Sequence, residues 1–136
     1  MRFVVQLLLT IIVIAVVAWW RRQRGLATHK GLSREEFVRY FAEIDVPDVV
    51  SGEVYDHFRE MVGVRGYRPS PTDSFEETFK MSGEDFDDEL KELLPRLGLE
   101  IPHSGKLRDW TRPLATLSDL VQWINWVRSN SKAEID

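Results

Sequence analysis

Three histidines and a few serines are the residues of this 136-residue sequence whose side chains most often carry catalysis or bind metals. His29, His57 and His103 lie far apart, and none has a second ligand beside it at a spacing typical of metal sites. Ser104 follows His103, but adjacency in the sequence does not create a nucleophile and its base. Cysteine is absent, which excludes disulfides and thiol nucleophiles. The sequence therefore predicts no catalytic residue, no metal site, no cofactor and no enzyme activity.

A dense group of carboxylates is the other chemical feature of the chain. These acids open a segment in which apolar residues recur at helical spacing from Phe86 to Leu97. One interpretation is a solvated helix whose first turn favours negative charge. The other is a face that steers a protein partner with a basic surface. We predict a partner-binding face made of Glu84, Asp85, Asp87, Asp88 and Glu89.

Capping boxes mark two of the helices that must position these residues. In a capping box a serine and an acid three residues later satisfy each other's backbone N–H groups. Ser33 with Glu36 predicts a first short helix, and Ser82 with Asp85 predicts the start of the acidic helix. Gly98 is expected to end the acidic helix, because glycine readily adopts the left-handed conformation found after helices.

Apolar periodicity predicts two further helices. Pro47 separates the first helix from a second over about 48–62, and a last helix begins after a cap at Thr116 or Ser118. Residues 63–74 have loop chemistry over an unusually long stretch. No segment has the alternation of a strand of any length, so the predicted fold class is all-α, a small helix bundle.

Three tryptophans accompany the last helix. An exposed aromatic docking patch is one interpretation of such a group. Large aromatic side chains near a helix are more often part of the core, which is the interpretation we favour. The residues are Trp110, Trp123 and Trp126.

The N-terminal segment predicts a membrane anchor. Residues 3–20 carry no charge, and Gln6 and Thr10 are their only polar members. A helix of this length spans roughly 27 Å, close to the hydrocarbon thickness of a bilayer. A cleaved signal peptide is the alternative, but the apolar run exceeds the usual length and no small-residue cleavage site ends it. We therefore expect one transmembrane helix within 1–24, followed by a linker over 25–32.

Aromatic and basic residues flank the end of this span. Positive charge is denser there than on the N-terminal side, where Arg2 and the amino terminus lie. The positive-inside rule then predicts a single-pass protein of the inner (cytoplasmic) membrane with a cytoplasmic soluble domain. The same basic residues suit anionic headgroups, so membrane lipid is an expected partner. The predicted membrane-interface residues are Trp19, Trp20, Arg21, Arg22 and Arg24.

The charge of the soluble part excludes one class of partner. The whole chain has a formal net charge of −4. Residues 1–24 carry four arginines and no acid, so the remaining 14 Lys and Arg against 22 Asp and Glu leave −8 on residues 25–136. Such a surface repels phosphate backbones, and we expect no nucleic-acid partner.

The order of landmarks from Gly63 to Pro102 resembles the acyl carrier protein family. A helix ends in Val62-Gly63-Val64, a long loop leads through Ser74-Phe75-Glu76-Glu77 to the acidic helix, and Gly98-Leu99-Glu100-Ile101-Pro102 follows. Residues 114–124 are similar to the carrier's last helix, after an insertion around 103–113. The resemblance covers about half of the chain. It implies an acyl-carrier-like helical domain over 33–136 whose acidic helix docks onto basic client enzymes.

One position departs from the family pattern. Carrier proteins attach phosphopantetheine to a serine at the start of the second bundle helix, where this chain has Gly83. The stretch from Met81 to Phe86 instead resembles an uncharacterised bacterial branch of carrier-like proteins without a prosthetic group. Ser82 is one residue away from the attachment position and is expected to cap the helix, and Ser74 lies nine residues too early.

These observations predict a membrane-anchored interaction module without catalytic activity. The module would be a carrier-like adaptor or an accessory subunit of a membrane-associated complex. A genuine acyl or phosphopantetheine carrier tethered to the membrane is the alternative, with Ser82 as the attachment residue. A small membrane subunit whose anchor makes the essential contacts is a third interpretation.

Overall fold

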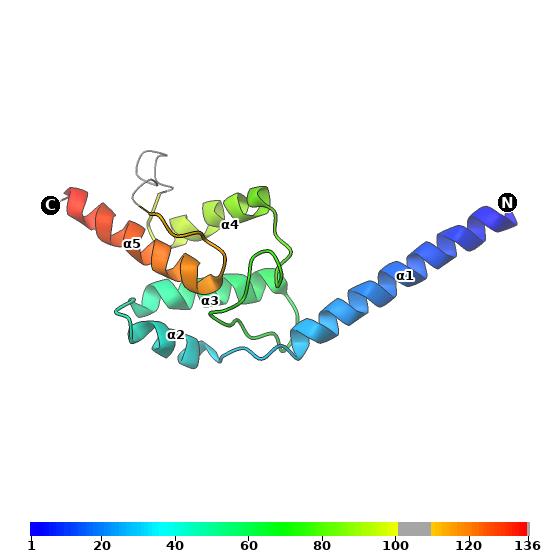
Figure 1. The fold of residues 1–136 in the computed structure, drawn as a ribbon, viewed down its shortest axis with the longest axis horizontal. Coiled ribbons are helices and arrows are strands. Elements are labelled where there is room, and N and C mark those ends of the chain that lie inside the picture. The colour runs from blue at the N-terminus through cyan, green and yellow to red at the C-terminus, as the bar shows by residue number, and fades with distance from the viewer. Residues whose placement is uncertain (101–109, 136) are drawn as a thin grey trace.

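The computed structural model describes residues 1–100 and 110–135, and the side chains of these up to Ser131. The described chain forms α1 (Arg2–Ala27), α2 (Arg34–Ala42), α3 (Asp48–Val62), α4 (Gly83–Arg96) and α5 (Leu117–Ile135). Within these ranges the one β-type pairing is an isolated bridge between Ser74 and Thr116. The all-α class is therefore confirmed. Figure 1 shows α1 projecting from a bundle that the other four helices form.

Helix α1 is long and apolar enough to cross a membrane. Its most apolar 18-residue window has a mean hydropathy of 2.6, and no residue of the helix is buried. A helix that exposes an apolar surface on all sides needs an apolar solvent, which a bilayer supplies. The helix continues to Ala27, beyond the expected end of the anchor at residue 24.

The predicted helix starts are found in the structure. Ser33 and Ser82 each accept a hydrogen bond from the backbone N–H three residues later, and both capping boxes are complete. Thr116 rather than Ser118 caps α5, since its hydroxyl accepts from the Asp119 N–H at 3.3 Å. The carboxylate of Asp119 accepts from the backbone N–H of Thr116 at 3.0 Å, which completes the cap.

The helix ends follow from glycine conformations. Gly63 ends α3 with a φ of 63°, and Gly98 follows α4 with a φ of 69°, both in the left-handed region. Pro95 lies inside the last turn of α4, and the helix ends one residue later, at Arg96.

Helix α3 lies at the centre of the bundle and packs against α2, α4 and α5. Phe58 on α3 packs against Phe75 and Phe79, between the long loop and α4, in tilted pairs with ring centroids 5.8 and 5.1 Å apart. Trp123 is buried, as expected, whereas Trp110 and Trp126 are half-buried and pack on the edge of the core. No residue of α1 is buried in this core, although Leu26 at the end of α1 packs against it. The core stabilises the domain by burial of apolar area.

The connection between anchor and domain, for which a linker over 25–32 was expected, is tightly held by the domain. The backbone N–H of Leu32 donates to the carbonyl of Pro69 at 3.1 Å, and the Tyr55 hydroxyl donates to the carbonyl of Leu32 at 2.9 Å. A Cβ atom added at Gly31 would lie 1.6 Å from the carbonyl oxygen of Arg68, so the two backbones touch. Residues 28–32 therefore hold α1 against the domain.

The long loop is ordered around a buried carboxylate. Asp73 is 2% exposed and accepts hydrogen bonds from the Tyr67 hydroxyl at 2.6 Å and the Ser70 N–H at 2.9 Å. His29 lies 2.5 Å from the same carboxylate and stacks on Tyr67, which joins the connection to the loop. Burial and the bond to Asp73 raise the pKa of Tyr67. A loop with this many internal hydrogen bonds is part of the scaffold.

Candidate interaction site

The five predicted partner-binding acids divide into two groups on α4. Glu84, Asp87 and Asp88 are exposed and form no ion pair with any residue that the structure describes. Asp85 and Glu89 instead have partners within the domain. The three acids of the first group are therefore the ones whose charge is available to another molecule.

Asp85 is engaged in the start of its own helix. Its carboxylate accepts from the Ser82 N–H at 2.9 Å, and the Ser82 hydroxyl accepts from the Asp85 N–H at 3.2 Å. The hydrogen bonds from Ser82 hold the pKa of Asp85 below its usual value. The negative charge of Asp85 is thus stabilised by these hydrogen bonds, and it interacts favourably with the positive end of the α4 dipole.

Glu89 joins α4 to α3. Its carboxylate is hydrogen-bonded to His57, and the two side chains are 23% and 4% exposed. Glu92 lies one turn further along α4, and ligand atoms of His57, Glu89 and Glu92 all lie within 4.8 Å of one another. One imidazole and two carboxylates are a ligand set that suits a divalent metal such as zinc. This cluster is invisible in the sequence, because its members come from two helices.

The remaining histidines have different settings. His29 contacts the buried Asp73, whereas His57 contacts Glu89. His103 and Ser104 lie outside the described residues, so the absence of a catalytic pair there stays a prediction.

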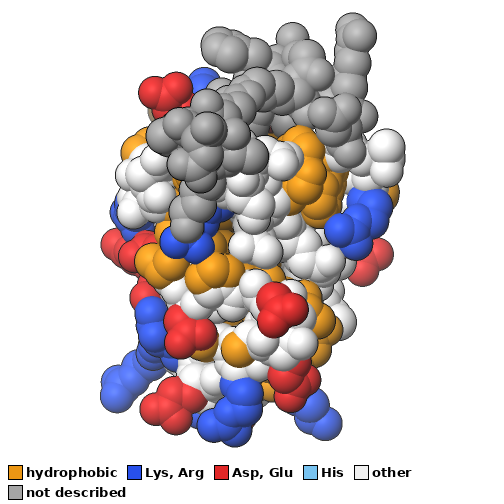
Figure 2. Space-filling model, turned by 90° about the vertical axis from the view of Figure 1, so that its left-hand side faces the viewer, with side chains coloured by type: hydrophobic (Ala, Val, Ile, Leu, Met, Phe, Trp, Pro, Cys, Tyr) orange, Lys and Arg blue, Asp and Glu red, His pale blue; other side chains and the backbone are white. Residues whose placement is uncertain are grey.

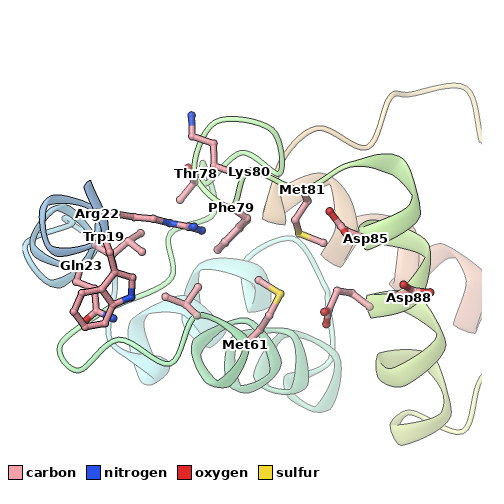
Figure 3. Close-up of a pocket in the computed structure, with 13 residues that line it drawn as sticks. Trp19, Arg22, Gln23, Met61, Thr78, Phe79, Lys80, Met81, Asp85 and Asp88 are labelled. Atoms are coloured by element: carbon pink, nitrogen blue, oxygen red, sulfur yellow. The ribbon is translucent and has the colours of Figure 1, made fainter. Parts of the chain in front are cut away.

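A groove lies between the end of the anchor and the domain (Figure 3). Its volume is about 410 Å³. Figure 3 shows Trp19, Arg22 and Gln23 on the anchor side, Met61 at the end of α3, and Asp85 and Asp88 on α4. A positive guanidinium and two negative carboxylates therefore face one groove from opposite walls. The groove was not predicted, because its walls lie about 60 residues apart in the sequence.

The predicted membrane-interface residues share the last turns of α1. The Arg24 guanidinium lies 4.2 Å from the centroid of the Trp20 ring, a cation–π contact. Trp19 and Arg22 line the groove, while Arg21 is exposed. Two tryptophans are thus followed closely by three arginines where a bilayer surface would lie.

Gly83 lies at an open position on the surface of the domain. A Cβ atom added at Gly83 would meet nothing within 4 Å, so the glycine is a surface position with no attachment oxygen. The neighbouring Ser82 hydroxyl caps α4, and the Ser74 hydroxyl accepts from the Glu77 N–H at 3.2 Å. Both candidate serines therefore have local structural roles.

Comparisons of the chain with protein-family models, with curated proteins and with solved structures find no match.

Proposed function

We propose that this protein is a membrane-anchored interaction module without catalytic activity, a carrier-like adaptor or accessory subunit of a membrane-associated complex. The observation that carries the proposal is the close attachment of a separately folded acidic domain to the apolar helix α1. Gly31 and Leu32 contact the backbone of the long loop, so the domain would stay at the bilayer surface. A partner in or on the same membrane would then meet α4 at a high effective concentration.

The acids of α4 supply the means of recognition. Glu84, Asp87 and Asp88 are exposed, and the neighbouring core residues Leu90 and Leu93 hold the helix in place. A fixed, negatively charged face raises the rate of encounter with a basic surface and disfavours acidic partners. The resemblance of residues 63–102 to acyl carrier proteins agrees with this proposal, since in that family the corresponding helix meets client enzymes.

The central experiment reverses the charge of this face in the full-length chain. Asp87→Lys/Asp88→Lys should remove protein partners recovered with the wild-type chain from detergent-solubilised membranes, because attraction to a basic surface becomes repulsion. Recovery of the wild-type complex should also fall as salt is raised, since exposed charges are screened within about 10 Å at 0.1 M ionic strength.

The matched control places the same charge change elsewhere. Glu35→Lys/Glu43→Lys reverses two exposed acids at the ends of α2 and should leave the set of partners unchanged. Circular dichroism of each purified variant confirms that it is folded. Partner recovery that is equal in both double variants would rule out α4 as the docking face.

The alternative function, a tethered carrier, makes a different prediction about mass. The chain expressed together with a phosphopantetheinyl transferase should keep its unmodified intact mass, because Gly83 has no hydroxyl. A stoichiometric mass increase that Ser82→Ala abolishes would replace the adaptor by the carrier.

A further inference from the structure

A second, smaller pocket lies on the side of the domain next to the end of the anchor. It has a volume of about 170 Å³. Its walls come from the start of α2, from α3 and from the loop that follows α3. The lining residues are Ser33, Arg34, Tyr55, Arg59, Gly66, Tyr67 and Arg68.

Three arginines around one small pocket are unusual in a domain with a net charge of −8 over residues 25–136. Arg34 is paired with Asp56, and this bidentate hydrogen bond is the main cause that raises the pKa of Arg34. Arg59 and Arg68 are exposed and form no ion pair with the described residues. Two guanidinium groups at the pocket are therefore not neutralised within the described chain.

The charges of Arg59 and Arg68 both act on the hydroxyl of Tyr55, which lines the same pocket. Burial raises the pKa of the Tyr55 hydroxyl, while the positive charges of Arg59 and Arg68 act to lower it. The negative charges of Asp56 on α3 and Glu36 on α2 act in the opposite direction on the pKa of Tyr55, but Asp56 is paired with Arg34 and Glu36 is engaged in the cap of α2. The hydroxyls of Tyr55 and Tyr67 already donate to Leu32 and Asp73, so the pocket combines two cationic donors with the hydroxyl of Ser33. Such a set of donors suits an oxyanion.

The pocket also lies near the expected level of the lipid headgroups. A Cβ atom added at Gly66 would lie 3.4 Å from the carbonyl oxygen of Ala27, so the pocket loop contacts the end of α1. Ala27 is seven residues after Trp20, a rise of about 10 Å along the helix. The headgroup layer extends about 5 to 8 Å beyond the hydrocarbon, so the end of α1 lies a few ångströms above it, and long arginine side chains can reach back to the headgroups.

We infer that the pocket of Arg59 and Arg68, supported by Arg34, binds the phosphate group of an anionic phospholipid. Arginine donates two hydrogen bonds in a plane that matches a phosphate, which gives the contact both strength and direction. The occupied pocket would add a second attachment of the domain to the membrane, besides α1 and its connection to the domain. The inference rests on the proposed membrane position of α1 but not on any protein partner.

The test uses the purified full-length chain in a non-ionic detergent, with thermal unfolding followed by tryptophan fluorescence. Dihexanoyl phosphatidylglycerol, a soluble short-chain anionic lipid, should raise the Tm of the wild-type chain in a saturable manner. Arg59→Gln/Arg68→Gln should raise the half-saturating lipid concentration roughly tenfold or more, because each basic residue at the surface contributes about fivefold. Arg39→Gln/Arg65→Gln removes two exposed arginines that do not line the pocket, and should leave the titration unchanged.

Inorganic phosphate in a parallel titration separates the two sources of this chemistry. The inference requires the lipid to saturate the wild-type chain at a lower concentration than inorganic phosphate does. Equal or tighter saturation by inorganic phosphate would identify a soluble phosphate ligand and overturn the lipid assignment. Equal losses in both double variants would show diffuse charge attraction instead of a site, and the absence of any Tm shift in the wild-type chain would also overturn it. Since no partner takes part, these results are independent of the test of α4.

Discussion

At the scale of single residues, Gly31 determines how closely the connection between α1 and the domain packs against the long loop. It has no room for a side chain, because an added Cβ atom would overlap the carbonyl of Arg68. The glycine is therefore required for a close backbone approach, since its φ is not in the left-handed region. The sequence does not distinguish this glycine from an ordinary linker glycine, because the residue it contacts, Arg68, lies 37 positions further along the chain.

Gly31→Ala should lower the stability of the domain by about 1 to 3 kcal/mol, the usual cost of forcing an extra group into a packed site. Thermal unfolding of the full-length chain, read from near-UV circular dichroism, measures the loss. Gly25→Ala is the control, because a Cβ atom there meets nothing within 4 Å. Equal Tm values for Gly31→Ala and the wild type would contradict the close packing of the connection.

Asp85 gives the stability of the domain a dependence on acid pH. Its pKa is lowered in the folded state, so its contribution is complete above the ordinary value of 3.8 and is lost as the pH falls through the lowered pKa. The Tm of the wild-type chain should therefore exceed that of Asp85→Asn at pH 6, and the difference should shrink below about pH 4. A difference that stays constant down to pH 2 would show that the Asp85 charge does not support the helix start.

At the scale of helices, the sequence predicted the features that depend on residues close together in the chain. The capping boxes at Ser33 and Ser82 placed the starts of α2 and α4 correctly, because each involves residues three positions apart. The groove and the contact between His57 and Glu89 could not be predicted, since they join segments that only the packing of the bundle brings together. The acidic face was predicted as a group of five, and packing leaves three of its members free of partners within the described chain.

The contact between α3 and α4 depends on Glu89. Glu89→Ala should destabilise the domain by about 1 to 3 kcal/mol, because it leaves the buried His57 without its hydrogen-bond partner. Glu92→Ala removes an exposed carboxylate one turn away and should change stability by no more than about 0.5 kcal/mol. Urea unfolding of both variants measures the two changes. Equal effects would mean that the hydrogen bond to His57 adds nothing to the packing of α4.

At the scale of the whole molecule, charge and apolarity are divided between the two ends. Most of the exposed large hydrophobic side chains belong to α1, which extends away from the bundle in Figure 1, while Tyr40, Ile44 and Val49 are exposed on the domain. The end of the domain opposite the anchor has acidic and basic side chains interspersed, as Figure 2 shows. The groove and the arginine pocket both lie where α1 meets the domain. The features proposed for recognition are thus gathered near the expected bilayer surface.

The proposed function requires that α1 crosses a bilayer. The absence of cysteine allows a direct measurement, because a single introduced cysteine is the only thiol in the chain. Thr10→Cys places the thiol in the middle of the apolar run, and Ser129→Cys places it on the exposed surface of α5. A membrane-impermeant maleimide is then added to intact cells and, separately, to cells whose membranes have been opened.

If α1 crosses the membrane and the domain is cytoplasmic, the thiol at position 129 should react only after the cells are opened. The thiol at position 10 should stay unreactive in both conditions until detergent dissolves the membrane. Reaction at position 129 in intact cells would reverse the orientation. Reaction at position 10 in opened cells without detergent would contradict the central claim, because α1 would then lie in water and the domain would have no membrane anchor.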